Sequence, residues 1–398
     1  MSLTLLLDLD DTLIDNSMDT FLPGYLQGLA RRLSPYTDAR RVAPELLDAT
    51  AFMINNKRPD RTLEEVFDQA FYPALKIEKA GVAATLEQFY AKDFPELRKL
   101  ISPRPEAVCL VEQALQRGYR VAIATAPLFP REAILERLRW AGLAAENYPF
   151  ALVPDYSKFH FAKPNPAYFA EFLAQMGWPD GPIIMVGDDY TADIVGAQAL
   201  GLPVFWIKNG QAKSEDGAKS IPQGELEDLL PWIDQQPAKN LKPDFRQPPA
   251  LCAILQSTPA ALSTLSQELD TNSLRQRRSP NEWSPLEIIC HLRDVESEVN
   301  LPRLQQATKE ENPFIAGRDT DPWTESRNYR QQDIHQVLAD FSATRIELVN
   351  RLENLSTEDW QRSVRHAIFG PTTVLELVQF MTDHDRLHIQ QFIQAKEN

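Results

Sequence analysis

The sequence predicts an α/β core domain built on a parallel sheet, a helical cap inserted into that domain, and an all-α four-helix bundle after it. Three observations predict this fold class. Short apolar runs alternate with longer helical patterns through the first half of the chain. About a hundred residues separate the first two apolar runs, far more than an ordinary crossover needs. In the last part of the chain the strand-like runs stop, and long amphipathic segments replace them.

Short apolar runs in the first half are the expected strands. Each run is almost continuous in apolar residues, as a strand buried on both faces requires. These runs are Leu3–Leu7, Tyr119–Ala124, Phe150–Val153, Ile183–Val186 and Pro203–Ile207. We therefore expect a parallel sheet within a core domain made of residues 1–16 and 102–234.

The segment between the first two runs, residues 17–101, is the expected cap. Apolar residues recur there at helical spacing, as in Phe21, Tyr25, Leu26 and Leu29. Thr62 with Glu65 three residues later is the pattern of a capping box, which marks the start of a helix. The cap should therefore be helical.

A polar segment that contains several prolines, residues 235–249, predicts a semi-rigid tether between two domains. Residues 250–398 then show long amphipathic patterns, which predict a four-helix bundle. The expected helices are Leu251–Leu269, Pro285–Ala307, Gln332–Leu355 and Thr373–Ala395. A hydroxyl cap followed by a carboxylate marks three starts, in the pairs Ser284 and Glu287, Ser356 and Asp359, and Thr373 and Glu376.

Composition limits the function classes. The chain has 398 residues, and 41 Lys and Arg against 56 Asp and Glu give a net charge of −15. This charge argues against a nucleic-acid or membrane partner, because both need a broad basic surface. The three cysteines are far apart and form no C-x-x-C pair, so neither a disulfide framework nor a thiolate zinc site is indicated. With no signal-peptide pattern and no long apolar span, we expect a cytoplasmic protein.

Acidic residues follow the first expected strand in Asp8-Leu-Asp10-Asp-Thr12. Ligands bind at the carboxyl edge of open parallel sheets, so this is where a site should form. The two carboxylates repel each other, and a divalent cation would offset the repulsion. Oxygen ligands without histidine or thiolate favour Mg²⁺.

Further polar residues follow the other expected strands. They are Thr125, Lys163 in Phe-Ala-Lys-Pro-Asn-Pro, Asp188 and Asp189 in Gly-Asp-Asp, and Asp193. Together with Asp8 they provide a nucleophile, metal ligands, a neutral hydrogen-bond donor and a fixed cation. Phosphoryl transfer to a carboxylate needs this combination of groups.

On these motifs, taken in order, residues from about Ser2 to Asp234 resemble the haloacid-dehalogenase (HAD) superfamily of hydrolases, with a Rossmann-like core and a helical cap. The resemblance implies that Asp8 attacks phosphorus to form an aspartyl-phosphate and that Asp10 acts as general acid and base. The second aspartate is typical of phosphatases and absent from the dehalogenase branch. The expected substrate is a small phosphorylated metabolite.

The resemblance also implies roles for the other motif residues. Thr125 would hold a phosphoryl oxygen, and Lys163 would neutralise the developing negative charge. Asp188 would join Asp8 and the backbone carbonyl of Asp10 on the Mg²⁺ ion. Asp193 would orient Lys163 or a metal-bound water, and Asp189 is a ligand in some relatives but not in others. Ala126 follows Thr125 where many relatives carry a small polar residue, so one phosphate donor is missing.

The C-terminal segment contains His384 and His388, four residues apart. On a helix both imidazoles point from one face and can bind one metal. His291 lies in the second expected helix of the bundle, and an adjacent helix could present it to the pair. The resulting three-histidine site would suit Zn²⁺, Ni²⁺ or Fe²⁺.

On this triad and Trp283, residues from about Pro249 onward resemble the DinB-like four-helix bundles. Relatives include thiol S-transferases in which the metal activates a small thiol. The leading hypothesis is therefore a Mg²⁺-dependent phosphatase joined to a metal-binding bundle. Two alternatives concern the bundle, which could be a metal-dependent thiol transferase or hydrolase, or a non-catalytic module that forms homodimers.

Overall fold

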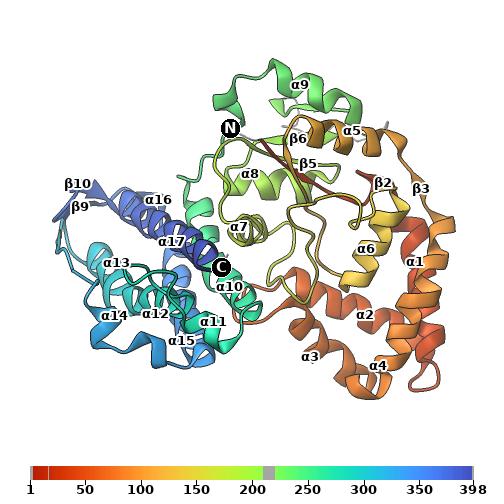
Figure 1. Ribbon diagram of the computed structural model, residues 1–398, viewed down its shortest axis with the longest axis horizontal. Helices are drawn as coiled ribbons and strands as arrows, with labels where there is room; N and C mark the ends of the chain where they lie inside the picture. Colours follow the sequence, from red (N-terminus) through yellow and green to blue (C-terminus); the bar gives the residue numbers. More distant parts are fainter. Residues whose placement is uncertain (1–2, 17, 209–219, 397–398) are drawn as a thin grey trace. The chain divides into compact units, whose positions relative to one another are not determined.

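The computed structural model describes residues 3–16, 18–208 and 220–396. The chain forms two compact units. The first contains residues 1–57, 61–169 and 179–244, and the second contains residues 58–60, 170–178 and 245–398. The predicted α/β fold with a following helical bundle is confirmed (Figure 1). The boundaries drawn from the sequence between core, cap, linker and bundle stay predictions.

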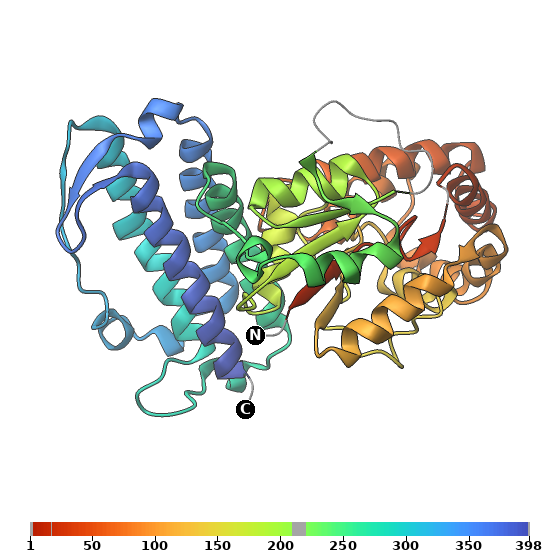
Figure 2. The same cartoon turned by 90° about the horizontal axis from the view of Figure 1, so that it is seen from above.

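A parallel sheet forms the core of the first unit. Within the described residues it has five strands in the order β4-β1-β5-β6-β7. These strands are β1 Thr4–Leu7, β4 Arg120–Ile123, β5 Ile183–Gly187, β6 Val204–Ile207 and β7 Gln223–Gly224. Helices lie on both faces of the sheet (Figure 2). The apolar side chains of β1 and β5 are fully buried, as their continuous apolar runs predict.

The predicted strand Phe150–Val153 is wrong. These residues lie beside β4, and Ala151 N donates to Val121 O at 2.8 Å while Ile123 N donates to Leu152 O at 2.9 Å. In a regular parallel ladder one residue makes both bonds, whereas here Ala151 makes one and Leu152 the other. The segment therefore pairs irregularly and is not a strand. Conversely, the sheet gains the two-residue strand β7, which the sequence did not predict.

Helices connect and follow the strands of the parallel sheet, and one of them, α7, continues from the first unit into the second at Ala170. They are α5 Pro105–Gln116, α6 Arg131–Trp140, α7 Pro166–Gln175, the π-helix η3 Tyr190–Val195, α8 Gly196–Leu200, the 3₁₀ helix η5 Leu226–Asp228, α9 Leu229–Gln235 and the 3₁₀ helix η6 Ala238–Leu241. The last of these lies in the predicted tether. Its Leu241 is buried in the core of the sheet domain, so this part of the tether has a fixed structure.

The cap is helical, as predicted. Its elements are α1 Met18–Leu33, α2 Ala39–Ile54, α3 Leu63–Leu75, α4 Lys79–Gln88, the π-helix η1 Phe89–Asp93 and the 3₁₀ helix η2 Phe94–Leu100. A two-stranded antiparallel sheet, β2 Ile14–Asp15 with β3 Ser102–Pro103, carries the chain into and out of the cap. Thr62 forms the predicted capping box with Glu65 at the start of α3.

Long helices lie side by side in the second unit (Figure 2). They are α10 Pro248–Gln267, α12 Pro285–Val295 continued by the π-helix η7 Glu296–Asn300 and α13 Leu301–Lys309, α15 Ile334–Glu353, and α17 Val374–Lys396. Helices α10 and α12 each pack against α15 and α17. Shorter helices are α11 Thr271–Arg275, α14 Trp323–Ser326, the 3₁₀ helix η8 Tyr329–Gln331 and α16 Thr357–Trp360.

The second unit differs from the prediction in two respects. Besides its helices it contains a small sheet that the sequence did not predict, in the order β10-β9-β8, formed by β8 Phe314–Ile315, β9 Ser363–His366 and β10 Gly370–Thr373. In addition, the capping box of Ser356 and Asp359 starts the short helix α16 and not a long helix. The capping box of Ser284 and Glu287 starts α12 as predicted.

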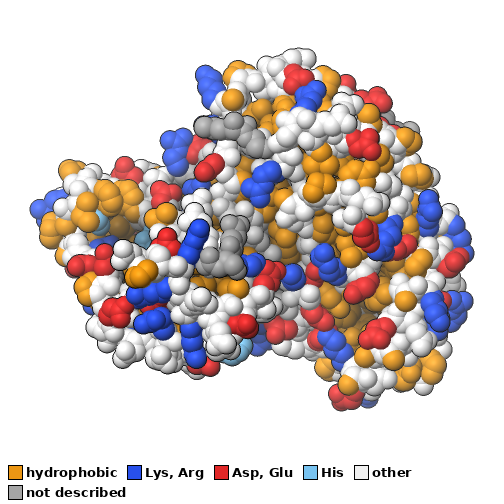
Figure 3. Space-filling model, viewed as in Figure 1, with side chains coloured by type: hydrophobic (Ala, Val, Ile, Leu, Met, Phe, Trp, Pro, Cys, Tyr) orange, Lys and Arg blue, Asp and Glu red, His pale blue; other side chains and the backbone are white. Residues whose placement is uncertain are grey.

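The surface is mixed in charge on the face shown in Figure 3. Lysine and arginine side chains alternate there with aspartate and glutamate, and apolar side chains lie among them. Among the described residues, no helix is both long enough and apolar enough to cross a membrane.

Candidate functional site

The register of the sheet brings the first group of predicted residues to one edge. Leu7 at the end of β1 pairs with Ile123 of β4 on one side and with Val186 of β5 on the other. The residues that follow these three therefore lie together at the carboxyl edge. This places Asp8 beside Asp188, and the buried Thr125 on the loop after β4.

Lys163 links two of the acids. Its Nζ donates to Asp8 Oδ1 at 2.7 Å and to Asp193 Oδ1 at 2.5 Å. All three side chains are buried. Asp193 Oδ2 also accepts from the backbone N–H of Asp189 at 3.1 Å. Asp193 therefore holds the Lys163 ammonium group in place beside Asp8.

Asp188 is held by different partners. The Thr12 hydroxyl donates to Asp188 Oδ1 at 3.0 Å, and the indole Nε1 of Trp206 donates to the Asp188 carbonyl at 2.8 Å. The preceding residue has to be glycine, because a Cβ atom at Gly187 would lie 2.2 Å from Asp193 Oδ2. The acids can approach this closely only because Gly187 has no side chain.

Burial shapes the charges at this edge. It raises the pKa of Asp188 to about 7, with a contribution from the nearby Asp193. Burial also raises the pKa of Asp8, although Lys163 opposes this shift. Burial alone would lower the pKa of Lys163, but Asp193 and Asp8 outweigh it and the pKa is raised. Lys163 is therefore a fixed cation. Its single positive charge does not neutralise the several carboxylates around it.

Asp10 contacts a residue that sequence reasoning missed. Its carboxylate accepts from Asn16 Nδ2 at 2.7 Å and forms an ion pair with Arg137 Nη1. Arg137 lies on α6 and is 2% exposed. Its Nε and Nη2 are buried and find no hydrogen-bond partner among the described residues. No local pattern marks this arginine, because 127 positions separate it from Asp10.

The predicted metal ligands do not all meet. One carboxylate oxygen each of Asp8, Asp188 and Asp193 lies within 4.8 Å of the others. Asp189 is exposed, and its side chain accepts from the backbone N–H of Ala192 at the start of η3. The side chain of Asp189 is thus used as a helix cap.

A cation suits the acidic cluster, because its acids have raised pKa values and Lys163 supplies only one positive charge. The three acids offer only oxygen atoms as ligands, and such ligands favour Mg²⁺ over softer metals. Asp8 and Asp188 would hold the ion, while both carboxylate oxygens of Asp193 are engaged, Oδ1 by Lys163 and Oδ2 by the backbone N–H of Asp189.

The cap is bonded to the loop that leads to Lys163. The first N–H groups of α3 have no partner within the helix and donate to this loop instead. Leu63 N donates to Phe159 O and Glu64 N donates to Tyr156 O, both at 2.8 Å. Asn56 Nδ2 in the cap donates to His160 O at 2.7 Å. These bonds join α3 to the lysine loop.

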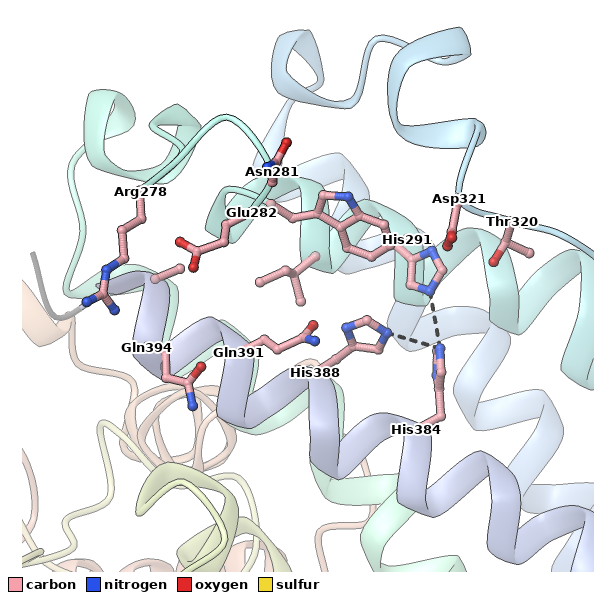
Figure 4. A pocket seen from close by; sticks show the side chains of 13 residues that line it. Arg278, Asn281, Glu282, His291, Thr320, Asp321, His384, His388, Gln391 and Gln394 are labelled. Carbon is pink, nitrogen blue, oxygen red and sulfur yellow. Dashed lines mark hydrogen bonds between the residues drawn. The ribbon is translucent and has the colours of Figure 1, made fainter.

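The second group of predicted residues meets in the helical unit. His291 comes from α12, and His384 and His388 come from neighbouring turns of α17 (Figure 4). The Nε2 atom of His384 lies 3.2 Å from that of His291 and 3.1 Å from that of His388. Trp283 stacks on His388, with ring centroids 5.7 Å apart.

The imidazoles are neutral in this environment. Burial and the nearby His384 lower the pKa of His291 to about 3. Burial, His384 and His291 together lower the pKa of His388 to about 2. Burial also lowers the pKa of His384. Neutral imidazoles facing one another through Nε2 offer lone pairs to a metal ion. The donor set therefore fits a transition metal, and the pocket that opens onto it has a volume of 760 Å³.

A buried ionic network lies beside the histidines. Arg345 Nε donates to Glu296 Oε1 at 2.6 Å, and Arg345 Nη1 donates to Asp385 Oδ2 at 2.6 Å. Burial raises the pKa of Glu296, and Arg345 opposes this shift. Asp385 follows His384 directly on α17, so the network fixes that turn of the helix.

Comparison with known proteins decides the family. Residues 3–201, half of the 398-residue chain, match the family of haloacid dehalogenase-like hydrolases. The chain belongs to this family. The acidic edge described above is thus the candidate active site of a haloacid dehalogenase-like hydrolase. Residues 254–392, which include the three histidines, match the DinB superfamily.

Individual relatives cover parts of this haloacid dehalogenase-like hydrolase. A phosphoserine phosphatase of Thermus thermophilus is 28% identical over 170 residues, which are 42% of this chain and 63% of the relative. The chain thus spans less than two thirds of that relative. Haloacid dehalogenase-like hydrolase domain-containing protein 2 of Homo sapiens is 25% identical over 231 residues, covering 54% of this chain and 88% of the relative. The structure of YfiT from Bacillus subtilis, described as a probable metal-dependent hydrolase with an unusual four-helix bundle topology, covers 40% of this chain and 90% of YfiT with 19% identity and a TM-score of 0.35.

Proposed function

We propose that the first unit is a Mg²⁺-dependent phosphatase that hydrolyses a small phosphorylated metabolite through an aspartyl-phosphate. One observation carries the proposal. Asp8 lies at the carboxyl edge of the sheet, 2.7 Å from the Lys163 ammonium group and next to Asp188. A buried nucleophile, a fixed cation and a second acid around one point are what phosphoryl transfer requires.

The chain's own residues perform each step of this reaction. The Asp8 carboxylate attacks phosphorus, and the bond to the ester oxygen breaks. Asp10 gives its proton to that oxygen, so the product leaves as an alcohol. Asp10 then takes a proton from a water molecule, which attacks the aspartyl-phosphate and regenerates Asp8 with release of phosphate. Lys163 and Thr125 bind the phosphoryl oxygens throughout.

A Mg²⁺ ion held by Asp8, the backbone carbonyl of Asp10 and Asp188 would offset the negative charge of the carboxylates and the phosphoryl group. Asp193 acts through Lys163 and is a positioning residue. We assign Asp189 to the helix cap and not to the metal, because its carboxylate accepts from Ala192 N at 2.8 Å.

A phosphate-release assay tests this proposal. The full chain with Mg²⁺ is offered phosphoserine, sugar phosphates, nucleotides, phospho-acids and simple alkyl and aryl phosphates. We expect Mg²⁺-dependent release from at least one of them, and its loss in Asp8→Asn. Release that survives Asp8→Asn, or no release from any compound, contradicts the proposal.

For the second unit we propose a metal centre that binds Zn²⁺, Ni²⁺ or Fe²⁺ through His291, His384 and His388. The 760 Å³ pocket, lined by polar side chains such as Arg278, Glu282 and Gln391, favours chemistry on a small molecule over a purely structural metal. Metal-dependent thiol transfer or hydrolysis is one such chemistry.

The competing role is a metal-stabilised homodimer. Thiol-dependent turnover that requires His384 supports chemistry. A full chain that is dimeric with metal, monomeric after chelation and inactive toward thiols and esters supports the dimerisation module.

A further inference from the structure

A cavity lies in the first unit beside the candidate active site. It has a volume of 250 Å³ and is lined by cap helices α1 to α4, by the π-helix η1 and by two loops of the core domain. The core contribution comes from Leu128–Pro130, just after Thr125, and from Tyr156, on the loop that leads to Lys163. The cavity is thus walled by the same loops that carry two predicted site residues.

The chemistry of the lining is almost entirely apolar. Leucine, isoleucine and aromatic side chains dominate it, and none of the described residues that line it is charged. The hydroxyl groups of Tyr25 and Tyr90 bond to each other at 2.9 Å. Burial raises the pKa of Tyr25 to about 12, so this hydroxyl stays neutral. A charged ligand entering this space would lose its hydration without gaining a partner.

Nearby charges do not alter this property. Lys79 pairs with Asp68 at 2.6 Å and with Glu64 at 2.7 Å. All three groups lie outside the cavity lining, and from there Asp68 and Glu64 act on Tyr72 and Tyr156. Among the described residues, none that lines the cavity can therefore form an ion pair with a carboxylate or an ammonium group.

Arg137 connects the cavity to the reacting groups. Its guanidinium carbon lies 4.5 Å from the ring centroid of Phe129, a residue of the cavity wall, while its Nη1 pairs with Asp10. The Arg137 side chain thus contacts both the proposed proton donor, Asp10, and the Phe129 ring in the cavity wall. Two buried nitrogen atoms of Arg137, Nε and Nη2, have no hydrogen-bond partner among the described residues and can donate to an oxygen atom of a substrate.

We propose that the natural substrate is the phosphate monoester of an uncharged, largely apolar alcohol, whose apolar part occupies this cavity while its ester oxygen lies at Asp10 and Arg137. This inference rests on the proposed phosphatase function and specifies its substrate class. It places phosphoserine, sugar phosphates and nucleotides among the poor substrates, because each carries charged or many polar groups into an apolar space.

A homologous series of n-alkyl phosphates from ethyl to octyl tests the inference on the full chain with Mg²⁺. Burial of each added methylene should raise kcat/KM about fourfold until the cavity is filled. Phosphoserine and glucose 6-phosphate should fall below butyl phosphate. A flat series, or phosphoserine above octyl phosphate, overturns the inference while phosphate release itself still upholds the proposed function.

A variant pair locates the effect in the cavity. Thr50→Trp on α2 fills part of the space and should lower kcat/KM for octyl phosphate by at least about 10-fold more than for ethyl phosphate. Phe52→Trp, at a site on the same helix that is 61% exposed and outside the cavity, should follow the wild-type series. Equal losses for all chain lengths in Thr50→Trp overturn the inference.

Binding of the alcohol product provides a measurement that does not depend on turnover or on Thr50. Calorimetry on the full-length Asp8→Asn protein should show binding of octanol that is at least about 10-fold tighter than that of butanol. If no ester is hydrolysed but octanol binds, the phosphatase function fails and the cavity assignment survives. If esters are hydrolysed but the alcohols do not bind, the substrate class is wrong.

Discussion

The two candidate sites solve opposite electrostatic problems. In the first unit, several buried carboxylates surround Lys163, and burial raises the pKa of Asp188 to about 7. In the second unit, burial keeps His291 and His388 neutral by lowering their pKa values. Desolvation disfavours the charged form in both sites. It leaves an excess of negative charge in one and a set of uncharged lone pairs in the other, so the two sites should select different cations.

Secondary structure positions the two sets of ligands differently. Asp8 and Asp188 follow parallel strands, whose register places their ends at one edge. His384 and His388 rely on the four-residue spacing of one helix, and only His291 has to come from another. The comparison predicts that each site can be disabled without disturbing the other.

The largest expected effect concerns the nucleophile. Asp8→Asn should lower phosphate release by about 10³-fold or more, because an amide cannot form the aspartyl-phosphate. The metal content of the histidine site should not change. Asp48→Asn, at an exposed position of α2, is the matched control and should keep full activity. Loss of the transition metal in Asp8→Asn would show that the sites are not independent.

Removal of a histidine should give the reciprocal result. A metal present at 100 times its Kd stabilises the folded protein by about 2.7 kcal/mol, and His384→Ala should abolish this stabilisation. Thermal unfolding with and without Zn²⁺, together with metal analysis, measures it. His335→Ala at an exposed position of α15 is the control. Zinc stabilisation that persists in His384→Ala would rule out the triad as the binding site.

Arg137 should matter for the rate of phosphate release, because it pairs with Asp10. Arg137→Met leaves Asp10 with Asn16 alone and should lower kcat by about 100-fold, since a misplaced proton donor costs this much. Arg137→Lys should recover part of kcat because it restores a cation near Asp10. Equal activity of Arg137→Met and wild type would remove Arg137 from the site.

The raised pKa of Asp188 predicts a pH dependence of stability. The folded protein keeps a proton on Asp188 up to about pH 7, whereas the unfolded chain releases it near pH 4. Without Mg²⁺ the free energy of unfolding of the first unit should therefore fall as the pH rises, by about 2.7 kcal/mol from pH 5 to pH 8 at about 1.36 kcal/mol per pH unit up to the folded pKa. Denaturation at pH 5 and pH 8 measures this difference.

Asp188→Asn and Mg²⁺ should each act on this pH dependence. The variant should remove the part of it that comes from Asp188, because its amide does not titrate. Mg²⁺ should stabilise wild type more at pH 8 than at pH 5, because the ion binds the ionised carboxylate. The transition of the first unit is the one that Mg²⁺ shifts. Without Mg²⁺, a transition of the first unit that is more stable at pH 8 than at pH 5 would contradict the sign. The transition of the second unit should move the other way, because its histidines have lowered pKa values.

The smallest expected effect compares equivalent helix starts in the two units. Thr62 caps α3 and Ser284 caps α12, each in a capping box. Thr62→Ala and Ser284→Ala should each cost about 1 kcal/mol of unfolding free energy. The loss should appear in the transition of the unit that carries the substitution. Loss of both transitions together in either variant would show that the units unfold cooperatively.

Local signals in the sequence predicted much of this structure. Buried parallel strands are continuous apolar runs, so β1, β4, β5 and β6 were recognisable. Capping boxes and the spacing of His384 and His388 are also local. The close approach of Asp8 and Asp188 could be predicted because residues after paired parallel strands share an edge.

Features that depend on distant contacts were missed. The ion pair of Arg137 with Asp10 joins residues 127 positions apart and leaves no motif. The small sheet β8–β10 consists of short strands, and Gly370-Pro371 in β10 is typical of a turn. The predicted strand Phe150–Val153 has the composition of a buried strand, but its bonds to β4 are out of register. The π-helix η7 interrupts what the periodicity presents as one continuous helix.

The bonds from Leu63, Glu64 and Asn56 to the lysine loop have a mechanical consequence. Helix α3 cannot leave that loop unless these hydrogen bonds break together, so α3 and the loop should travel as one body. The chain crosses between cap and core only through β2 and β3, which pair at two positions. The cap is thus held to the core at the lysine loop and at β2 and β3. We expect substrate to enter by a displacement of α1 and α4, while α3 keeps its position relative to the Lys163 ammonium group.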